Sequence, residues 1–521
     1  MSQGPSETDP QLARNGADPP GPAADRSQSS YDRPPGWSAP GAALVASAET
    51  DARPSLVELG RVHIVGIAGA GTSGLARLLL ARGVSVSGSE ARESDTVRAL
   101  RALGATVHVG HSAEHLDGID TVVYSTAIPP GHLELRAARA RGLPVLRRAS
   151  ALAAALGDRR GIAIAGTHGK TTTTSLLTVA AQACGLDPSF AIGGNLYETG
   201  RNAHFGSGEW AVIEADESDG SFLLLEPEIA VVTNVEADHL ENHGDLAGVR
   251  RAFEQFTHHI VDGGLLVACA DDPGSAAIAQ YGRERGLRVL TYGERATADV
   301  VVSDVVEGPS AVTFGVTGPV ERSAVTLGAL VGRHMALNGA AALTVAAELS
   351  LDLDRVAEVW RNFAGVQRRF ELRGTADGVR VYDDYAHHPT EVAASLRAAR
   401  AASGTGRLIA VFQPGTFSRT QTFAIEFGRA LGLADVAVVM DIFPAREEPI
   451  PGVTGALIAD AVPLAAENVI YEPSWGATAE RIVAVARPGD LVMTMGIGDV
   501  HLICPDILRL LVSRAAADAR S

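Results

Sequence analysis

The sequence predicts an α/β protein built from three domains. Its 521 residues allow about three domains at roughly 150 residues each. Apolar strands alternate with amphipathic helical stretches, which is typical of parallel sheets covered by helices on both faces. This pattern starts afresh three times, near residues 62, 161 and 332. We therefore expect three separate sheets along the chain.

Composition suggests where the ordered part begins. Nine of the 26 prolines lie before residue 55, in a stretch without apolar periodicity, which favours disorder. The expected organisation is a disordered tail followed by a first, a central and a C-terminal domain, at residues 1–54, 55–158, 159–331 and 332–521.

The strands are expected where short apolar runs follow turn residues. The run at 300–314 alternates more and suggests an antiparallel extension of the second sheet. Expected strands are 62–67, 84–87, 106–109 and 121–124 in the first domain, 161–165, 210–214, 229–233, 264–268, 300–303 and 311–314 in the second, and 381–384, 408–412, 436–440 and 491–495 in the third.

Composition also excludes several classes of protein. A net charge of −17, from 44 basic and 61 acidic residues, argues against a nucleic-acid binder. No run of about 18 apolar residues is present, so we expect no membrane insertion. The sequence lacks a secretory signal, and its three cysteines form no CxxC pair. These features suit the reducing cytoplasm.

A GxGxxG motif, from Gly69 to Gly74, follows the first strand and opens a helix. Glycines there let the backbone approach a diphosphate at the helix N-terminus, and Glu90 ends the next strand where a ribose-binding acid is expected. The motif alone does not distinguish a dinucleotide from a nucleotide sugar. A purely structural glycine turn also remains open.

The stronger motif is a shortened P-loop between a buried strand and a helix. Its lysine, Lys170, is the only lysine among the 44 basic residues. In such a loop the backbone cradles phosphates, the lysine reaches the β and γ phosphates, and the following threonine binds Mg²⁺. The expected ATP-binding residues here are Gly166, Thr167, His168, Gly169, Lys170, Thr171 and Thr172.

Acidic residues follow the next two strands of the central domain. Four acids lie between Glu214 and Asp219, and a second group ends at His239. Carboxyl ends of parallel strands face the same crevice, so one of these acids is a natural Mg²⁺ ligand. A solvated acidic loop is the alternative. His239 fits a second metal or a phosphate contact.

The C-terminal domain carries polar groups after its turns and strands. The arginine pair that ends at Arg369 suits phosphate oxygens, and so does Arg419. The acids and histidines at 383–391 suit a ribose or a metal.

Taken in order, these motifs resemble the Mur ligase family. The resemblance runs from about residue 60 to about 510 and covers all three domains. It rests on GIAGAG, AGTHGKTTTT, EADESDGSF, VTNVEADH, GRHMALN, RRF, DDYAHHPTE, FQP and AREEPIPG.

The resemblance implies a Rossmann-like N-terminal domain, a central P-loop ATPase-like domain and a Rossmann-like C-terminal domain. It implies a ligase that uses ATP and Mg²⁺ to join L-alanine to the lactyl carboxylate of UDP-N-acetylmuramate through an acyl phosphate, in peptidoglycan precursor synthesis. The implied catalytic residues are Lys170, Glu214, His239 and Arg369.

The same resemblance assigns the remaining binding residues. It places adenine near His334 and Asn338, ribose near Asp384 and phosphate near Arg419, beside the P-loop. Thr171, Glu214 and His239 are the implied metal ligands. The implied UDP-sugar residues are Gly69, Ala70, Gly71, Glu90, Gly193 and Gly194.

Two loops depart from the family pattern. Gly415 and Thr416 follow FQP, where the family often has histidine and a basic or apolar residue. Ile497 stands where the family usually has alanine in the late GAGD loop. The single lysine also excludes a second, carbamylated lysine as a metal ligand.

Three other functions remain to be compared. A ligase that adds a recycled tripeptide to the same UDP-sugar shares the P-loop, although ESDGSF and VEADH disfavour it. A nicotinamide oxidoreductase would explain GxGxxG and Glu90 but not the P-loop and the acids. A nucleotide-binding module without ligase activity is disfavoured by the intact Lys170, Thr171 and Glu214.

Overall fold

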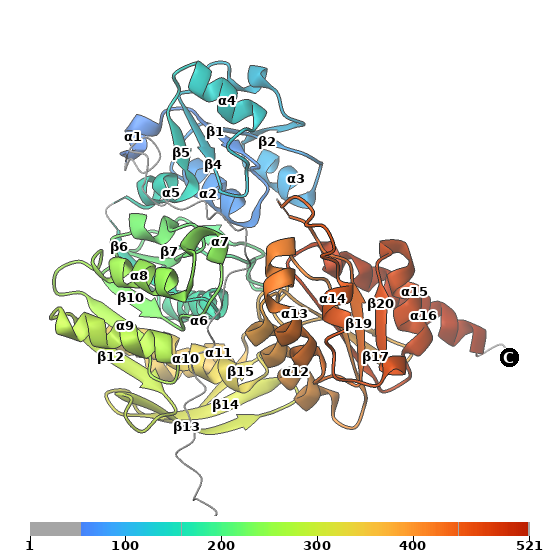
Figure 1. Ribbon diagram of the computed structural model, residues 1–521. Helices are drawn as coiled ribbons and strands as arrows, with labels where there is room; N and C mark the ends of the chain where they lie inside the picture. The colour runs from blue at the N-terminus through green and yellow to red at the C-terminus, as the bar shows by residue number, and fades with distance from the viewer. Residues whose placement is uncertain (1–53, 158, 446, 519–521) are drawn as a thin grey trace, which may run out of the picture. The chain divides into compact units, whose positions relative to one another are not determined.

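The computed structural model describes residues 54–157, 159–445 and 447–518. The predicted tail, residues 1–54, lies outside these ranges except for its last residue. The three expected sheets are present and contain five, ten and six strands (Figure 1). They fall within the expected ranges 55–158, 159–331 and 332–521, whose boundaries stay predictions. In the described part of the chain, no helix is long and apolar enough to cross a bilayer.

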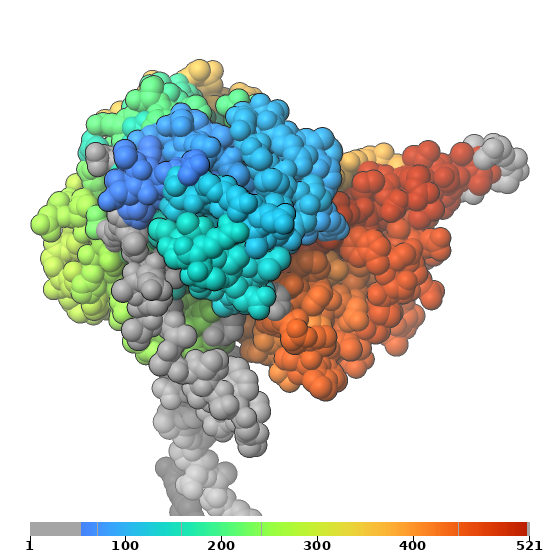
Figure 2. All heavy atoms as spheres, turned by 90° about the horizontal axis from the view of Figure 1, so that it is seen from above, coloured from blue at the N-terminus to red at the C-terminus, as the bar shows by residue number. Residues whose placement is uncertain are grey.

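The first sheet is wholly parallel, in the order β3-β2-β1-β4-β5. The residues of this sheet and of the helices around it, coloured blue to cyan, form a continuous surface in Figure 2. The strands are β1 (Val62–Val65), β2 (Val86–Glu90), β3 (Thr106–Val109), β4 (Thr121–Tyr124) and β5 (Val145–Arg147), and the helices are α1 (Leu56–Leu59), α2 (Ala70–Ala81), α3 (Asp95–Ala102), α4 (Leu133–Ala140) and α5 (Arg148–Leu156).

Two expected strands in this sheet have wrong bounds. The strand expected at 62–67 ends at Val65, where the glycine loop begins. The strand expected at 84–87 begins at Val86 and ends at Glu90. Gly83 has φ +78°, and the backbone N–H of Val84 donates to the carbonyl of Leu79, so Val84 closes the preceding helix. The strand can start only after that cap.

The second sheet has the order β15-β14-β13-β12-β11-β10-β6-β9-β7-β8. As expected, its β13–β15 edge is antiparallel. The strands are β6 (Arg160–Ala165), β7 (Ser189–Ala191), β8 (Ala203–His204), β9 (Trp210–Glu214), β10 (Ile229–Val232), β11 (Leu265–Cys269), β12 (Arg288–Gly293), β13 (Val300–Glu307), β14 (Ala311–Thr317) and β15 (Arg322–Gly328).

Helices bury both faces of the second sheet. Helices α10 and α11, although they follow residue 332, contribute Ala340 and Trp360 to the core that also contains Ile164 and Leu176. The helices are α6 (Lys170–Ala183), α7 (Leu240–His243), α8 (Leu246–Thr257), α9 (Pro273–Glu284), α10 (Arg333–Glu348) and α11 (Leu353–Arg361).

The third sheet has the order β16-β17-β21-β18-β19-β20 and is parallel except at β16. Separate apolar cores cover its two faces. Its elements are β16 (Glu371–Ala376), β17 (Val379–Asp384), β18 (Leu408–Phe412), β19 (Val436–Met440), β20 (Val469–Glu472), β21 (Leu491–Met495), α12 (Pro389–Ser403), α13 (Phe417–Leu431), α14 (Ala456–Ala459), α15 (Trp475–Val485) and α16 (Cys504–Asp518).

Candidate active site

The P-loop connects β6 to α6, and close contacts fix its shape. Gly166 has φ +131°, and a Cβ there would lie 2.0 Å from the Thr233 hydroxyl. Gly169 has φ +84°, and a Cβ there would lie 2.5 Å from the Asn338 side-chain oxygen. The backbone N–H of His168 donates to the Asn234 side chain over 2.8 Å. Positions 166 and 169 therefore require glycine, and their backbone turns direct the first turn of α6 across the carboxyl edge of the sheet.

The Lys170 side chain is only 14% exposed, and its ammonium lies inside this loop. Its Nζ donates to the Gly166 carbonyl over 2.6 Å and to Glu217 Oε2 over 2.8 Å. Burial alone would lower the pKa of Lys170, but the charges of Glu217 and Asp216 raise it above its usual value. Lys170 is therefore a fixed positive charge at the position where a P-loop receives phosphate.

Oxygen donors meet beside Lys170. Thr171 Oγ1 lies 3.1 Å from Glu214 Oε1, and the backbone N–H of Gly193 holds Glu214 Oε2 at 2.7 Å. A Cβ on Gly193 would lie 2.6 Å from this carboxylate, so a side chain there would displace it. Arg369 donates to Thr171 Oγ1 over 3.2 Å. A hydroxyl and a carboxylate oxygen at this spacing suit a hard cation such as Mg²⁺.

His168 joins the P-loop to acids from two other elements. Its Nδ1 lies 3.2 Å from Glu391 Oε1, and its Nε2 lies 3.6 Å from Glu236 Oε2. Burial alone would lower the pKa of His168, but Glu391 and Glu236 raise it to about 10. The imidazole is consequently charged at neutral pH and ties the second sheet to α12.

Arg419 and His239 both contact Asp238. Arg419 donates to Asp238 Oδ1 over 2.6 Å, and His239 Nε2 lies 3.5 Å from Asp238 Oδ2. Burial would raise the pKa of Asp238, but the Arg419 charge holds it well below its usual value. His239 has φ +52°, at the end of the loop after β10. Asp238 thus gathers two of the expected site residues.

The residues expected near adenosine come from α10 and from the end of β17. Asn338 lies against Gly169, and burial lowers the pKa of His334 to about 4, which keeps its imidazole neutral. Asp384 accepts from the backbone N–H groups of Phe370 and Ala386. Burial raises the pKa of Asp384 to about 6. A Cβ on Gly194 would lie 2.8 Å from the Val366 side chain.

The expected UDP-sugar residues of the first sheet form a separate group. Gly69 is the N-cap of α2, with Ala70 next to it, and a Cβ on Gly71 would lie 3.0 Å from the Arg148 guanidinium. Glu90 accepts from the backbone N–H of Ala68 over 3.0 Å, so its carboxylate lies against the glycine loop.

The structure adds residues that the sequence analysis did not assign. Arg148 lies 3.6 Å from Asp216 and so bridges the glycine loop and the acidic loop. The Thr126 hydroxyl donates to Asp219 Oδ2 over 3.0 Å, in the same acidic loop. Glu217 and Glu391 were visible as members of acidic motifs, whereas nothing in the local sequence marks Arg148 or Thr126.

The two departures from the family pattern are neighbours in space. A Cβ on Gly415 would lie 2.4 Å from Ile497 Cγ2. The isoleucine occupies the room that a side chain at position 415 would need. Thr416 accepts from the backbone N–H of Arg419 and so caps the helix that carries this arginine. We therefore expect the residues at 415 and 497 to be coupled.

Comparisons with known proteins cover the same three regions. Models of the Mur ligase family match residues 61–160 (Mur ligase family, catalytic domain), 164–346 (Mur ligase middle domain) and 368–498 (Mur ligase, glutamate ligase domain).

Similar proteins extend over almost the whole chain. A UDP-N-acetylmuramate–L-alanine ligase of Saccharopolyspora erythraea is 55% identical over 86% of this chain and 93% of its own length. One of Kineococcus radiotolerans is 54% identical over 88% and 98%. The crystal structure of a UDP-N-acetylmuramate-alanine ligase of Thermotoga maritima has a TM-score of 0.73 at 26% identity, covering 88% of this chain and 99% of its own.

A further solved structure shares the fold alone. A murein peptide ligase of Psychrobacter arcticus has a TM-score of 0.66 at 24% identity, covering 87% of this chain and 99% of its own.

The contact at Gly415 predicts a compensating pair of substitutions. Gly415→Ala is expected to destabilise the protein by about 1–3 kcal/mol, because its methyl group overpacks against Ile497. Ile497→Ala should remove most of that cost. Denaturant unfolding of both single variants and the double variant measures the coupling, which we expect at about 0.5–3 kcal/mol. Additive effects would show that the two positions are independent.

The raised pKa of His168 predicts a pH-dependent contribution to stability. A histidine whose pKa is raised on folding stabilises fully below its unfolded value, near 6.5, and loses that effect as pH rises through about 10. His168→Gln should therefore cost about 1.5–3 kcal/mol at pH 6 and much less at pH 10.5.

The measurement is denaturant unfolding of wild type and variant at both pH values. His258→Gln, which removes only a contact with Tyr281, serves as the matched control. An equal cost of His168→Gln at pH 6 and pH 10.5 would contradict the assignment.

Proposed function

The chain belongs to the Mur ligase family, and we propose that its P-loop and strand-end carboxylates activate the lactyl carboxylate of UDP-N-acetylmuramate. The activity is the ATP-dependent joining of L-alanine to this sugar nucleotide, an amide-forming step of peptidoglycan precursor synthesis. The observation that supports our assignment of the site is the meeting of Lys170, Thr171 and Glu214 at one edge of the second sheet.

ATP is proposed to lie along the P-loop, with its phosphates at the N-terminus of α6. The loop N–H groups and Lys170 would bind the phosphates, and Asn338, His334 and Asp384 would hold the nucleoside. Mg²⁺ fits the pair of oxygens from Thr171 and Glu214, where it would neutralise charge on the phosphate oxygens. His239 is proposed as a ligand of a second metal.

The first step transfers the γ-phosphoryl group of ATP to the lactyl carboxylate. A carboxylate oxygen attacks phosphorus, the bond to ADP breaks, and an acyl phosphate forms. Negative charge accumulates on the transferred oxygens, where Lys170, Arg369 and Arg419 would stabilise it. For this, Lys170 must exchange part of its contact with Glu217 for phosphate, since Nζ has three donors.

The second step forms the amide. The neutral amine of L-alanine attacks the acyl carbon, phosphate leaves with the former carboxylate oxygen, and the nitrogen loses a proton. The UDP moiety is proposed to bind at Gly69–Gly71 and Glu90, while Gly193 and Gly194 line the muramyl sugar. Arg148 lies beside Gly71 and 3.6 Å from Asp216, where it would contact a substrate that extends from the first sheet to the acidic loop.

The alternatives are less well supported. Relatives at 50–55% identity carry the name of the alanine-adding enzyme, whereas the likeness to a murein peptide ligase supports a common fold alone. Both ATP and the UDP-sugar are cytosolic metabolites, so we propose that the protein acts in the cytoplasm. The partners we propose are small-molecule substrates.

The acceptor is tested by phosphate release. With ATP, Mg²⁺ and UDP-N-acetylmuramate, release should peak with L-alanine among single amino acids, and the product should gain one alanyl residue by mass. Phosphate released faster with the tripeptide would assign the chain to recycling. No release with any acceptor would instead support a binding module.

Lys170 is tested by substitution. Lys170→Met should lower kcat at least about 100-fold, because a preorganised charge facing the phosphates is lost. Lys170→Arg should not restore activity, since a planar guanidinium does not fit a pocket made for a point charge. Binding of the UDP-sugar, measured by calorimetry, should change less than threefold. Ligation at near wild-type rate in Lys170→Met would refute the assignment.

A further inference from the structure

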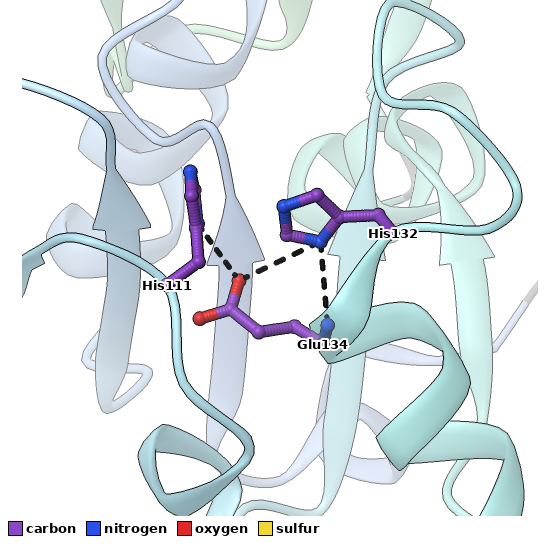
Figure 3. A group of neighbouring side chains, drawn as sticks. All are labelled: His111, His132 and Glu134. Atoms are coloured by element: carbon purple, nitrogen blue, oxygen red, sulfur yellow. Dashed lines mark hydrogen bonds and ion pairs between the residues drawn. The ribbon is translucent and has the colours of Figure 1, made fainter.

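A cluster of histidines surrounds one buried carboxylate beside the first sheet, and none of these side chains is assigned above. Glu134 lies in the first turn of α4 and is fully buried. His111 follows β3, and His132 is the N-cap of α4. Figure 3 shows both imidazole rings and the carboxylate converging. The sequence analysis did not single out these residues.

The ligand atoms of these three side chains are close together. Glu134 Oε2 lies 3.3 Å from His111 Nδ1 and 4.0 Å from His132 Nδ1. One ligand atom from each of the three side chains lies within 4.8 Å of the other two. A tetrahedral ion with bonds near 2.05 Å separates its ligands by about 3.3 Å, so small ring rotations would bring the ligands to coordinating distance. If His132 bound through Nδ1, it would exchange for the ion its 3.3 Å contact with the backbone N–H of Glu134.

The other carboxylate oxygen is already held in place. Glu134 Oε1 lies 3.0 Å from His115 Nδ1 and accepts from the backbone N–H of Ser112 over 3.3 Å. The Ser89 hydroxyl donates to Oε2 over 2.6 Å. Such outer contacts orient a metal-binding carboxylate. The His111 side chain is 27% exposed, so an ion can enter from solvent.

The charges around Glu134 leave a place for a cation. Within the described residues, every ion pair of Glu134 is with a histidine. A buried carboxylate is favourable only when its charge is balanced.

The cluster adjoins the candidate UDP-sugar residues through the backbone, since the Gly110 N–H donates to the Glu90 carbonyl over 2.8 Å, but its side chains lie on another face. Side chains alternate along β2, so Ser89 contacts Glu134 on one face of the sheet, whereas Glu90 contacts the glycine loop. The second metal-like group of the molecule, His168, Glu236 and His388, belongs to the candidate ATP site of another sheet.

We propose that His111, His132 and Glu134 bind a divalent transition-metal ion of the Zn²⁺ class, with a water molecule completing the coordination. Two imidazoles and one carboxylate form a donor set typical of Zn²⁺ and of Co²⁺ as its substitute. The ion would fasten the loop after β3 to the start of α4. This proposal does not depend on the ligase activity.

Co²⁺ titration of the full chain, after removal of metals with a chelator, tests the site. Wild type should show visible d–d absorption that saturates at one ion. His132→Asn should lose these bands or raise their dissociation constant at least tenfold. Asparagine can still cap α4 at this position, so loss of binding is separated from loss of folding, which the melting temperature checks.

Two variants assign the bands to the proposed site. His258→Gln, in the second domain, and His388→Asn, in the second metal-like group, should both leave them unchanged. Wild type without bands, bands that survive in His132→Asn, or bands lost only in His388→Asn would overturn the proposal.

Discussion

One ammonium group enclosed by carboxylates constrains the shape of the candidate ATP site. Lys170 Nζ is fixed between the Gly166 carbonyl and Glu217, with Asp216 and Glu214 close enough to influence its pKa. A buried charge needs this pairing to remain in the fold. The pairing therefore requires that the loop glycines, the acids after β9 and the start of α6 all lie close to Lys170.

The third sheet completes this arrangement through charged contacts. Arg369 reaches Thr171, Arg419 pairs with Asp238, and Glu391 pairs with His168. Each contact joins a residue after residue 367 to the carboxyl edge of the second sheet, where the phosphates of ATP are proposed to lie. The guanidinium groups of Arg369 and Arg419 can exchange these partners for phosphate oxygens, which is what phosphate binding requires.

Local sequence patterns predicted three sheets, most of their central strands and the P-loop, because buried strands and glycine turns are encoded over a few residues. The sequence analysis did not predict seven strands, several of them short or at a sheet edge, namely β5, β7, β8, β12, β15, β16 and β20. The strand at Val86 was misplaced because the helix cap at Val84 has the same apolar character. Contacts between distant segments could not be predicted. The approach of Arg148 to Asp216, the contact of Gly415 with Ile497 and the histidines around Glu134 all depend on how separate elements pack.

The central claim is that the P-loop site phosphorylates the lactyl carboxylate before the amide forms. Labelling both oxygens of that carboxylate of UDP-N-acetylmuramate with ¹⁸O tests it most directly, by mass spectrometry of the phosphate released during ligation with L-alanine. Our account predicts one ¹⁸O atom in each phosphate, since the bridging oxygen of the acyl phosphate leaves with phosphorus. Unlabelled phosphate, formed at the same rate as the amide, would contradict it.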